Sequence, residues 1–263
     1  GLRTLTVIRD TVKLIEINHG LKIDLDQIKF DDPKIFQMFA NAETLGIFQF
    51  ESPGMRAFLK ELKPNVFENL IAANSLFRPG PMNQIPTFVA CKHDPSKIEY
   101  IHPKLEHILD VTYGCIVYQE QVMQIVRDIG GYSMGRADLV RRAMGKKKMD
   151  VMEEERKNFI YGQTNENEEV LLTGAIRNGV DEKSASMIYD LMIDFANYAF
   201  NKSHSAAYAV IAYRTAWLKT YYPVEFMAAL ISSIMGDTNQ VSLYIQECKR
   251  LGIEILSPDI NES

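Results

Sequence analysis

The chain has 263 residues and a net charge of −5, with 46% hydrophobic, 24% charged and 10% aromatic residues. These fractions are ordinary for a globular protein and exclude disordered, collagen-like and low-complexity classes. Its apolar stretches fall short of the ~20 residues of a membrane span, and its three widely spaced cysteines do not form a disulfide framework, so we expect a cytoplasmic chain without a membrane partner.

Helical periodicity and capping residues predict that most of the chain is α-helical, with one or two short strands. We expect helices up to Gly20, from Pro33 and Pro53 onward, and over 66–77. The RPGP run at 78–81 is expected to be a rigid turn, and 82–102 a long loop. Residues 114–118 (GCIVY) are predicted to be either a buried strand or the start of the next helix.

In the second half of the chain, helices are predicted over 120–129, 150–162, 181–197, 203–222 and 239–251, with others starting at Ser133 and Pro223. Ser133, Asp181 and Ser203 are the expected N-caps, because their side-chain oxygens can accept from backbone N–H groups of the first turn. The polar residues 163–169 (QTNENEE) are predicted to form a mobile surface loop. No signal peptide is visible. The chain starts with Gly rather than Met, and its first residues have the pattern of the middle of a folded segment, so we expect a piece of a longer protein.

Charge is unevenly distributed along the chain. Six of the seven charged residues in 136–148 are basic, residues 150–169 hold seven acids and two bases, and 195–224 holds no acid. Two basic zones on an acidic background indicate a focused anion site rather than a general nucleic-acid coat. For the lysine run of 146–148 alone, a solvated helix end explains the pattern equally well, because the helix dipole favours cations there.

The predicted helix after Ser133 carries two adjacent arginines. A helical projection places Val140, Ala143 and Met144 on one apolar face, and it places Arg141 and Arg142 together on an exposed face. Two guanidinium groups followed by three lysines are suited to phosphate or polyphosphate. The alternative is an exposed helix whose Arg136 and Arg142 only pair with acids such as Asp138.

A second candidate site lies at residues 197–205, just before a predicted helix. Aromatic, amide, hydroxyl, ammonium and imidazole side chains alternate there, and free backbone N–H groups at a helix start favour an anion. Lys202 and His204 would add donors, and Tyr198 or Phe200 could stack on a base. The alternative is a capped turn whose aromatic rings fill the core.

Two other patterns resemble metal sites only weakly. Asp24 and Asp26 form a D-x-D motif, which a half-buried stretch with outward polar residues explains as well. Cys91, His93, His102 and His107 match no common structural zinc spacing. The chain has no phosphate-binding glycine loop and no nucleophile elbow, so a self-contained enzyme of those classes is not expected.

At these residues the sequence resembles the alpha subunit of bacterial DNA polymerase III, the C-family replicative polymerase. The segments that carry the resemblance are GIFQFESPGM (46–55), LFRPGPM (76–82), YGCIVYQEQVM (113–123), GGYSMGRADLVRRAMGKKK (130–148), FNKSHSAAYAVIAYRTAWLK (200–219), PVEFMAAL (223–230) and LSPDINES (256–263). They follow one another along the whole chain, which is far more specific than a short motif. The match departs mainly around 161–175.

The resemblance implies a helical fingers region over 21–263, joined to the palm by 1–20, with nucleotide-facing segments at 130–148 and 197–208. It implies that Arg141 and Arg142 hold the triphosphate of an incoming dNTP, with Lys146, Lys147 and Lys148 nearby. It also implies that the nucleotide pocket is lined by Tyr198, Asn201, Lys202 and His204, with Arg78 as a weaker candidate.

The resemblance also implies the reaction and the partners. A primer 3′-hydroxyl would attack the α-phosphate and release pyrophosphate, with Mg²⁺ held by palm carboxylates outside this chain. The implied partners are primer–template DNA, and the sliding clamp and clamp loader through regions mostly outside the chain. The chain alone is expected to be inactive. The alternatives are a non-catalytic helical module that binds nucleic acid or protein, and a metalloenzyme that uses Cys91 and the three nearby histidines.

Overall fold

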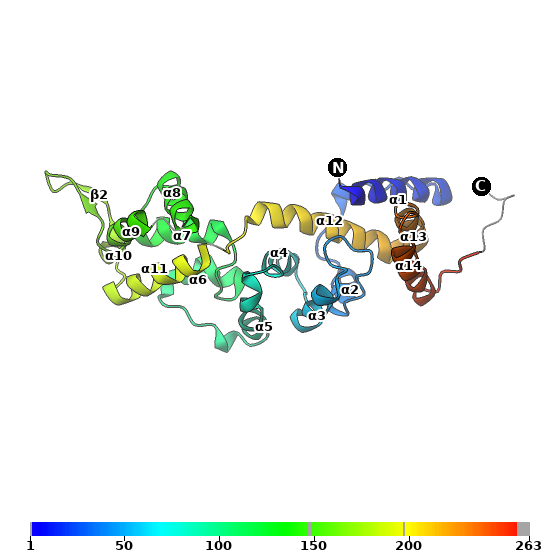
Figure 1. Ribbon diagram of the computed structural model, residues 1–263, viewed down its shortest axis with the longest axis horizontal. Coiled ribbons are helices and arrows are strands. Elements are labelled where there is room, and N and C mark those ends of the chain that lie inside the picture. Colours follow the sequence, from blue (N-terminus) through cyan, green and yellow to red (C-terminus); the bar gives the residue numbers. More distant parts are fainter. Residues whose placement is uncertain (1, 147–148, 197, 257–263) are drawn as a thin grey trace. The chain divides into compact units, whose positions relative to one another are not determined.

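The computed structural model describes residues 2–146, 149–196 and 198–256, which are mainly helical (Figure 1). The mainly α prediction is therefore confirmed. The described residues divide into two compact units: one holds those up to Leu70 and those from Ala207 onward, and the other spans Ile71–Ala206. None of the helices in the described part of the chain is both long and apolar enough to cross a membrane.

The first unit is built from helices of both ends of the chain. It contains α1 (Arg3–His19), α2 (Pro33–Ala40), α3 (Pro53–Leu62), α13 (Pro223–Ser232) and α14 (Thr238–Arg250), together with parts of α4 (Phe67–Leu76) and α12 (Lys202–Tyr221). α1 packs against α13. The buried Tyr213 ring lies 5.1–5.9 Å from the rings of Phe30, Phe36 and Phe67, and its hydroxyl accepts from the backbone N–H of Asp32.

Local sequence accounts for several helix ends in this unit. Asp32 accepts from the N–H of Lys34, Ser52 accepts from the N–H of Met55, and a proline follows each cap. Both predicted starts are therefore confirmed. Gly20 ends α1 as predicted, because its φ of 67° lies in the left-handed region, which glycine adopts without a Cβ clash.

The second unit surrounds α7 (Gln119–Gly130). Its other elements are α5 (Ile85–His93), α6 (Glu106–Leu109), α8 (Met134–Gly145), α9 (Met149–Tyr161), α10 (Gly174–Arg177), α11 (Glu182–Ala196) and an antiparallel pair, β1 (Gln163–Thr164) and β2 (Val170–Leu172). Single 3-10 turns lie at Pro81–Gln84, Pro95–Lys97, Pro103–Leu105 and Asp110–Thr112, and one at Leu25–Gln27 belongs to the first unit. Figure 1 shows α7, α8 and α9 close together within this unit, and contacts join each pair.

The core of the second unit fixes the orientation of α8. Val122, Ile125 and Ile129 of α7 are fully buried, and Val140 and Met144 of α8 belong to the same hydrophobic cluster. The apolar face predicted for α8 is therefore the buried one. At about 25 cal/mol per Å² of apolar area, this packing stabilises α8 far more than its exposed charges do.

Three sequence predictions about local structure are wholly or partly wrong. The expected loop over 82–102 contains α5, whose Pro86 occupies the first turn, where its missing N–H removes no helical hydrogen bond. The surface loop expected over 163–169 is shorter, because β1 takes up Gln163 and Thr164, and within it the side chain of Asn165 accepts from the N–H groups of Asn167 and Glu169. Residues 114–118 form no strand of a sheet. Only an isolated parallel bridge joins Tyr118 to Phe200, and α7 starts at the next residue.

Candidate phosphate-binding site

The arginine helix α8 begins as predicted. The Ser133 hydroxyl accepts from the N–H of Arg136 at 3.3 Å, and Ala137, Val140, Ala143 and Met144 are buried along one face. Leu139 is left 64% exposed. The helix ends at Gly145, and the exposed Lys146 caps it through its backbone N–H. Lys147 and Lys148 lie outside the described residues.

The two arginines of α8 differ in exposure. The side chain of Arg142 is 61% exposed, whereas that of Arg141 is only 19% exposed. The prediction that both leave the packed face together is thus confirmed for Arg142 and is wrong for Arg141. Arg141 and Arg142 follow Asp138 by three and four residues, which is about one helical turn. One carboxylate can therefore reach both guanidinium groups.

Asp138 is bonded to both arginines. Its Oδ1 accepts from Nε and Nη2 of Arg141 at 3.2 and 2.6 Å, and its Oδ2 lies 2.6 Å from Nη2 of Arg142. The hydrogen bond from Arg141, and then that from Arg142, holds the pKa of the Asp138 carboxyl below its ordinary value. The alternative expected Arg136 and Arg142 to pair with acids such as Asp138. Arg142 does pair with Asp138, Arg136 pairs with another acid, Glu155, at 3.2 Å, and Arg141 joins Asp138 as well.

The start of α12 is capped by the chain's own side chains. Asn201 Oδ1 accepts from the N–H of His204 at 2.9 Å, so Asn201 is the cap and the prediction of Ser203 is wrong. The carboxylate of Glu120 accepts from the N–H of Lys202 at 3.0 Å and from Nδ2 of Asn201 at 2.8 Å. The N–H groups expected to be open to an anion are thus partly occupied by a carboxylate.

Two of the predicted cations and the His204 imidazole gather around the bridge between Tyr118 and Phe200. The Arg78 guanidinium lies 4.1 Å from the centre of the Phe200 ring, and the His204 ring meets the same ring edge-on at 5.3 Å. Lys202 Nζ lies 5.0 Å from the centre of the Tyr118 ring. Such cation–π contacts hold charged groups in place while they stay accessible to solvent.

The neighbouring segments fix the position of this group. The Ser75 and Ser205 hydroxyls lie 2.6 Å apart in the interior and join the end of α4 to the start of α12. Tyr198 is 48% exposed, and its ring lies against Gly80, where an added Cβ would come within 2.3 Å of it. This close approach, together with a φ of 102°, explains the glycine in the RPGP turn.

The two predicted segments approach each other where α8 and α11 end. A Cβ placed on Gly145 would lie 3.7 Å from the carbonyl oxygen of Ala196, which comes two residues before Tyr198. The structure therefore brings Arg78, Tyr198, Asn201, Lys202 and His204 together, and it places the end of α8 against the end of α11. Sequence reasoning missed Glu120, because no local signal reveals a cap contributed from 81 residues away.

The weaker metal patterns have other roles. Asp24 caps the 3-10 turn at 25–27, and Asp26 pairs with Arg214. His102 Nδ1 accepts from the N–H of Lys104, and His107 pairs with Asp128 at 3.3 Å. Within the described ranges, no group of three or more His, Cys, Asp or Glu side chains is arranged to hold a metal ion. The metalloenzyme alternative is therefore without support there.

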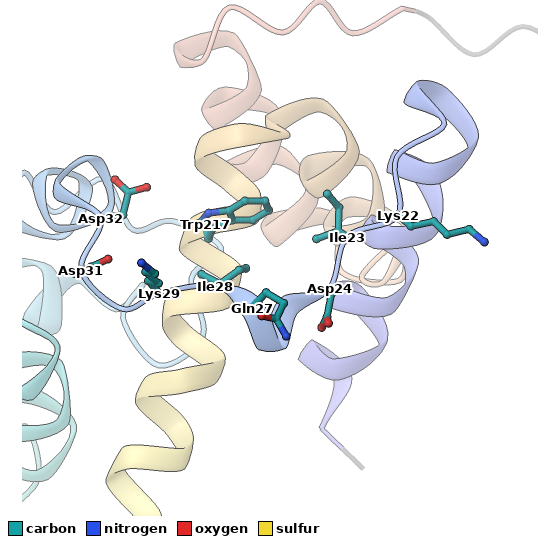
Figure 2. A pocket seen from close by; sticks show the side chains of 9 residues that line it. All are labelled: Lys22, Ile23, Asp24, Gln27, Ile28, Lys29, Asp31, Asp32 and Trp217. Carbon is teal, nitrogen blue, oxygen red and sulfur yellow. The ribbon is translucent and has the colours of Figure 1, made fainter.

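An open hollow of about 420 Å³ lies in the first unit, beside Trp217 (Figure 2). Figure 2 shows Ile23, Gln27 and Ile28 around the indole, with Lys22 directed away. Asp32 is already occupied there, because it caps α2 and accepts from the Tyr221 hydroxyl at 2.6 Å. Asp24 of the D-x-D pattern lines this hollow, and none of the residues predicted to bind the nucleotide does.

The fold and its exposed cations define a mainly helical protein with groups suited to a phosphate-bearing ligand. A family model, the bacterial DNA polymerase III alpha subunit finger domain, matches residues 4–167. Over all 263 residues the chain is 44% identical to the DNA polymerase III subunit alpha of Staphylococcus aureus (strain COL), of which it covers 24%. It is 46% identical to that of Rickettsia prowazekii (strain Madrid E), of which it covers 21%.

The chain therefore belongs to the family of bacterial DNA polymerase III alpha subunits, and it carries their finger domain. The resemblance drawn from the sequence is confirmed. The chain spans about a quarter of the length of the curated relatives it matches.

Proposed function

We propose that the chain binds the triphosphate of an incoming deoxynucleotide and the backbone of primer–template DNA, as the fingers region of a replicative DNA polymerase. The observation that carries this proposal is the gathering of Arg78, Lys202 and His204 around Phe200 and Tyr118. Cations held on aromatic rings are suited to phosphate, and the exposed Tyr198 ring offers a surface for a base.

The roles within the site follow from exposure. Arg142 presents the more accessible guanidinium, and Arg141 supports it from a less exposed position. Lys146 extends the charge beyond the helix, and Lys147 and Lys148 would do the same. Asn201, Lys202 and His204 would contact the sugar or the phosphates. The arginine and lysine side chains would neutralise the charge that develops on the leaving pyrophosphate.

Nucleotidyl transfer itself is proposed for the longer protein. Its DNA, clamp and clamp-loader partners, its cytoplasmic location and the junction of 1–20 with a palm remain proposals that follow from family membership. The family's chemistry uses Mg²⁺. The described residues hold no cluster that fits a metal ion, so the ligands would come from elsewhere in the longer protein.

The test measures binding of labelled primer–template DNA, with and without the matching dNTP, across a salt series. The variants are Arg142→Ala and Arg141→Ala/Arg142→Ala. The matched control is Lys157→Ala/Lys183→Ala, which removes two charges from exposed positions of α9 and α11 in the same unit. We expect the arginine double variant to lose about tenfold in the dNTP-dependent affinity, as for a lost charge-assisted hydrogen bond, and the control to keep it. Equal losses in both double variants would favour a non-specific helical module.

A further inference from the structure

The carboxylate of Asp138 lies between the two arginines assigned to phosphate. Each of its oxygens faces one guanidinium group, with Nη2 of Arg141 and Nη2 of Arg142 both at 2.6 Å. The Asp138 side chain is 25% exposed and that of Arg141 19% exposed, so both lie in a partly dehydrated setting. This arrangement resembles how guanidinium groups surround a bound oxyanion.

Asp138 uses the edge of Arg141 that a phosphate would use. A guanidinium group binds phosphate best through two parallel N–H donors, and Nε and Nη2 of Arg141 both donate to Oδ1. The carboxylate also reduces the charge of the cluster, since two arginines and one aspartate carry a net charge of +1. A phosphate that enters must displace Asp138 or accept a weaker set of donors.

We propose that Asp138 is an internal competitor for phosphate at the Arg141–Arg142 pair and that it sets the affinity of this pair for polyanions. The inference rests on the proposed function, because it assumes that these arginines receive phosphate oxygens. A ligand with several adjacent negative charges displaces the carboxylate, whereas a singly charged anion competes poorly. Asp138 thereby makes the pair selective for triphosphate over smaller anions.

The test is Asp138→Asn, which keeps the shape and one acceptor oxygen but removes the charge. The probes are inorganic tripolyphosphate, dATP and primer–template DNA without nucleotide, so nucleotide phosphate and DNA backbone are measured separately. We expect tripolyphosphate or dATP to bind about three- to tenfold more tightly, because the ligand no longer has to break the partly exposed ion pairs of Asp138 with Arg141 and Arg142. The binding should also depend more steeply on salt. Asp138→Ser gives a second, shorter neutral variant, and a thermal melt verifies that each variant is folded.

The matched control is Asp128→Asn, which removes the same charge from another arginine pair, that of Arg127 on α7. It is expected to leave all three affinities within about twofold, the scale of one screened surface charge. The inference fails if the neutral Asp138 variants bind all three probes no more tightly than the wild type while Arg141→Ala/Arg142→Ala still lowers affinity. If the arginine double variant has no effect either, the proposed function fails as well.

Discussion

Lys219 is a fully buried ammonium group whose loss we expect to destabilise the first unit strongly. Its Nζ donates to the carbonyl oxygens of Glu43 and Leu45 at 3.1 and 2.8 Å and to the Glu247 carboxylate at 2.6 Å. The side chains of Lys219 and Glu247 are 0% and 3% exposed. Three donors thus meet three acceptors, and they join α12, α14 and the segment after α2.

The substitution Lys219→Met keeps the length of the side chain and removes all three hydrogen bonds. Removing one member of a buried ion pair costs about 3–5 kcal/mol. Glu247 keeps two hydrogen bonds from Arg250, both at 2.8 Å, which places the loss at the lower end of that range. The two carbonyl groups lose a donor each, at about 1 kcal/mol apiece. We therefore expect a loss of roughly 3–4 kcal/mol, since these terms overlap.

Urea unfolding followed by Trp217 fluorescence measures this loss. Trp217 is the one tryptophan of the sequence and belongs to the same unit as Lys219, so its signal reports on that unit. With a denaturant slope of about 2 kcal/mol per molar urea, the midpoint falls by ~1.5–2 M. The matched control is Lys249→Met on the exposed side of α14. A shift in Lys219→Met no larger than that of the control would refute the reasoning.

Three further predictions follow from individual contacts. Gly80→Ala should lower the thermal midpoint and change the Tyr198 environment in NMR spectra, because φ is 102° and the new Cβ overlaps the Tyr198 ring. Burial raises the pKa of the Cys115 thiol to about 12, so iodoacetamide at pH 8 should label it at least tenfold more slowly in the folded chain than in urea; equal rates would contradict this. Burial acts to raise the pKa of Glu247, but hydrogen bonds from Arg250 and Lys219 outweigh it and leave that pKa below 4.5. The unfolded chain then binds more protons than the folded chain, so stability is lost as the pH falls below 4.5. The unfolding midpoint detected by Trp217 fluorescence should therefore fall with pH in this range, and Glu247→Gln should make this fall less steep.

The sequence predicts the helices well where local chemistry decides. Asp32, Ser52 and Ser133 are caps in the structure, and each acts on the first turn that follows it. Proline is a less reliable signal. Pro86 and Pro95 favour a loop over 82–102, but a proline in the first turn is as compatible with a helix start as with a helix end, and Pro86 lies in the first turn of α5.

The site is less predictable because long-range contacts decide it. Asn201 caps α12 in place of Ser203, and Glu120 reaches the same helix start from α7. The exposure of Arg141 depends on how α8 packs, and a helical projection cannot supply that information. The residue types of the site are thus readable from the sequence, while their partners are set by the fold.

The two carboxylates found at the candidate site have different physical roles, and one comparison separates them. Glu120 supplies a cap to α12, so Glu120→Ala should cost about 1 kcal/mol of stability, whereas Glu120→Gln should retain most of it through its amide oxygen. Asp138 lies within α8 and caps no helix end, so its neutral variants should change phosphate affinity more than stability.

In the absence of a ligand, the positive side chains of an anion-binding surface repel one another, and nearby carboxylates reduce this repulsion. That Asp138 pairs with both Arg141 and Arg142 is therefore no argument against a binding site, because a ligand with more charge can take the carboxylate's place. Melting each variant with and without tripolyphosphate distinguishes the two roles. The Asp138→Asn variant should gain more stability from the ligand than the wild type does, and Glu120→Gln should gain about as much as the wild type. The same ligand-induced gain in all three proteins would mean that Asp138 is an ordinary surface ion pair.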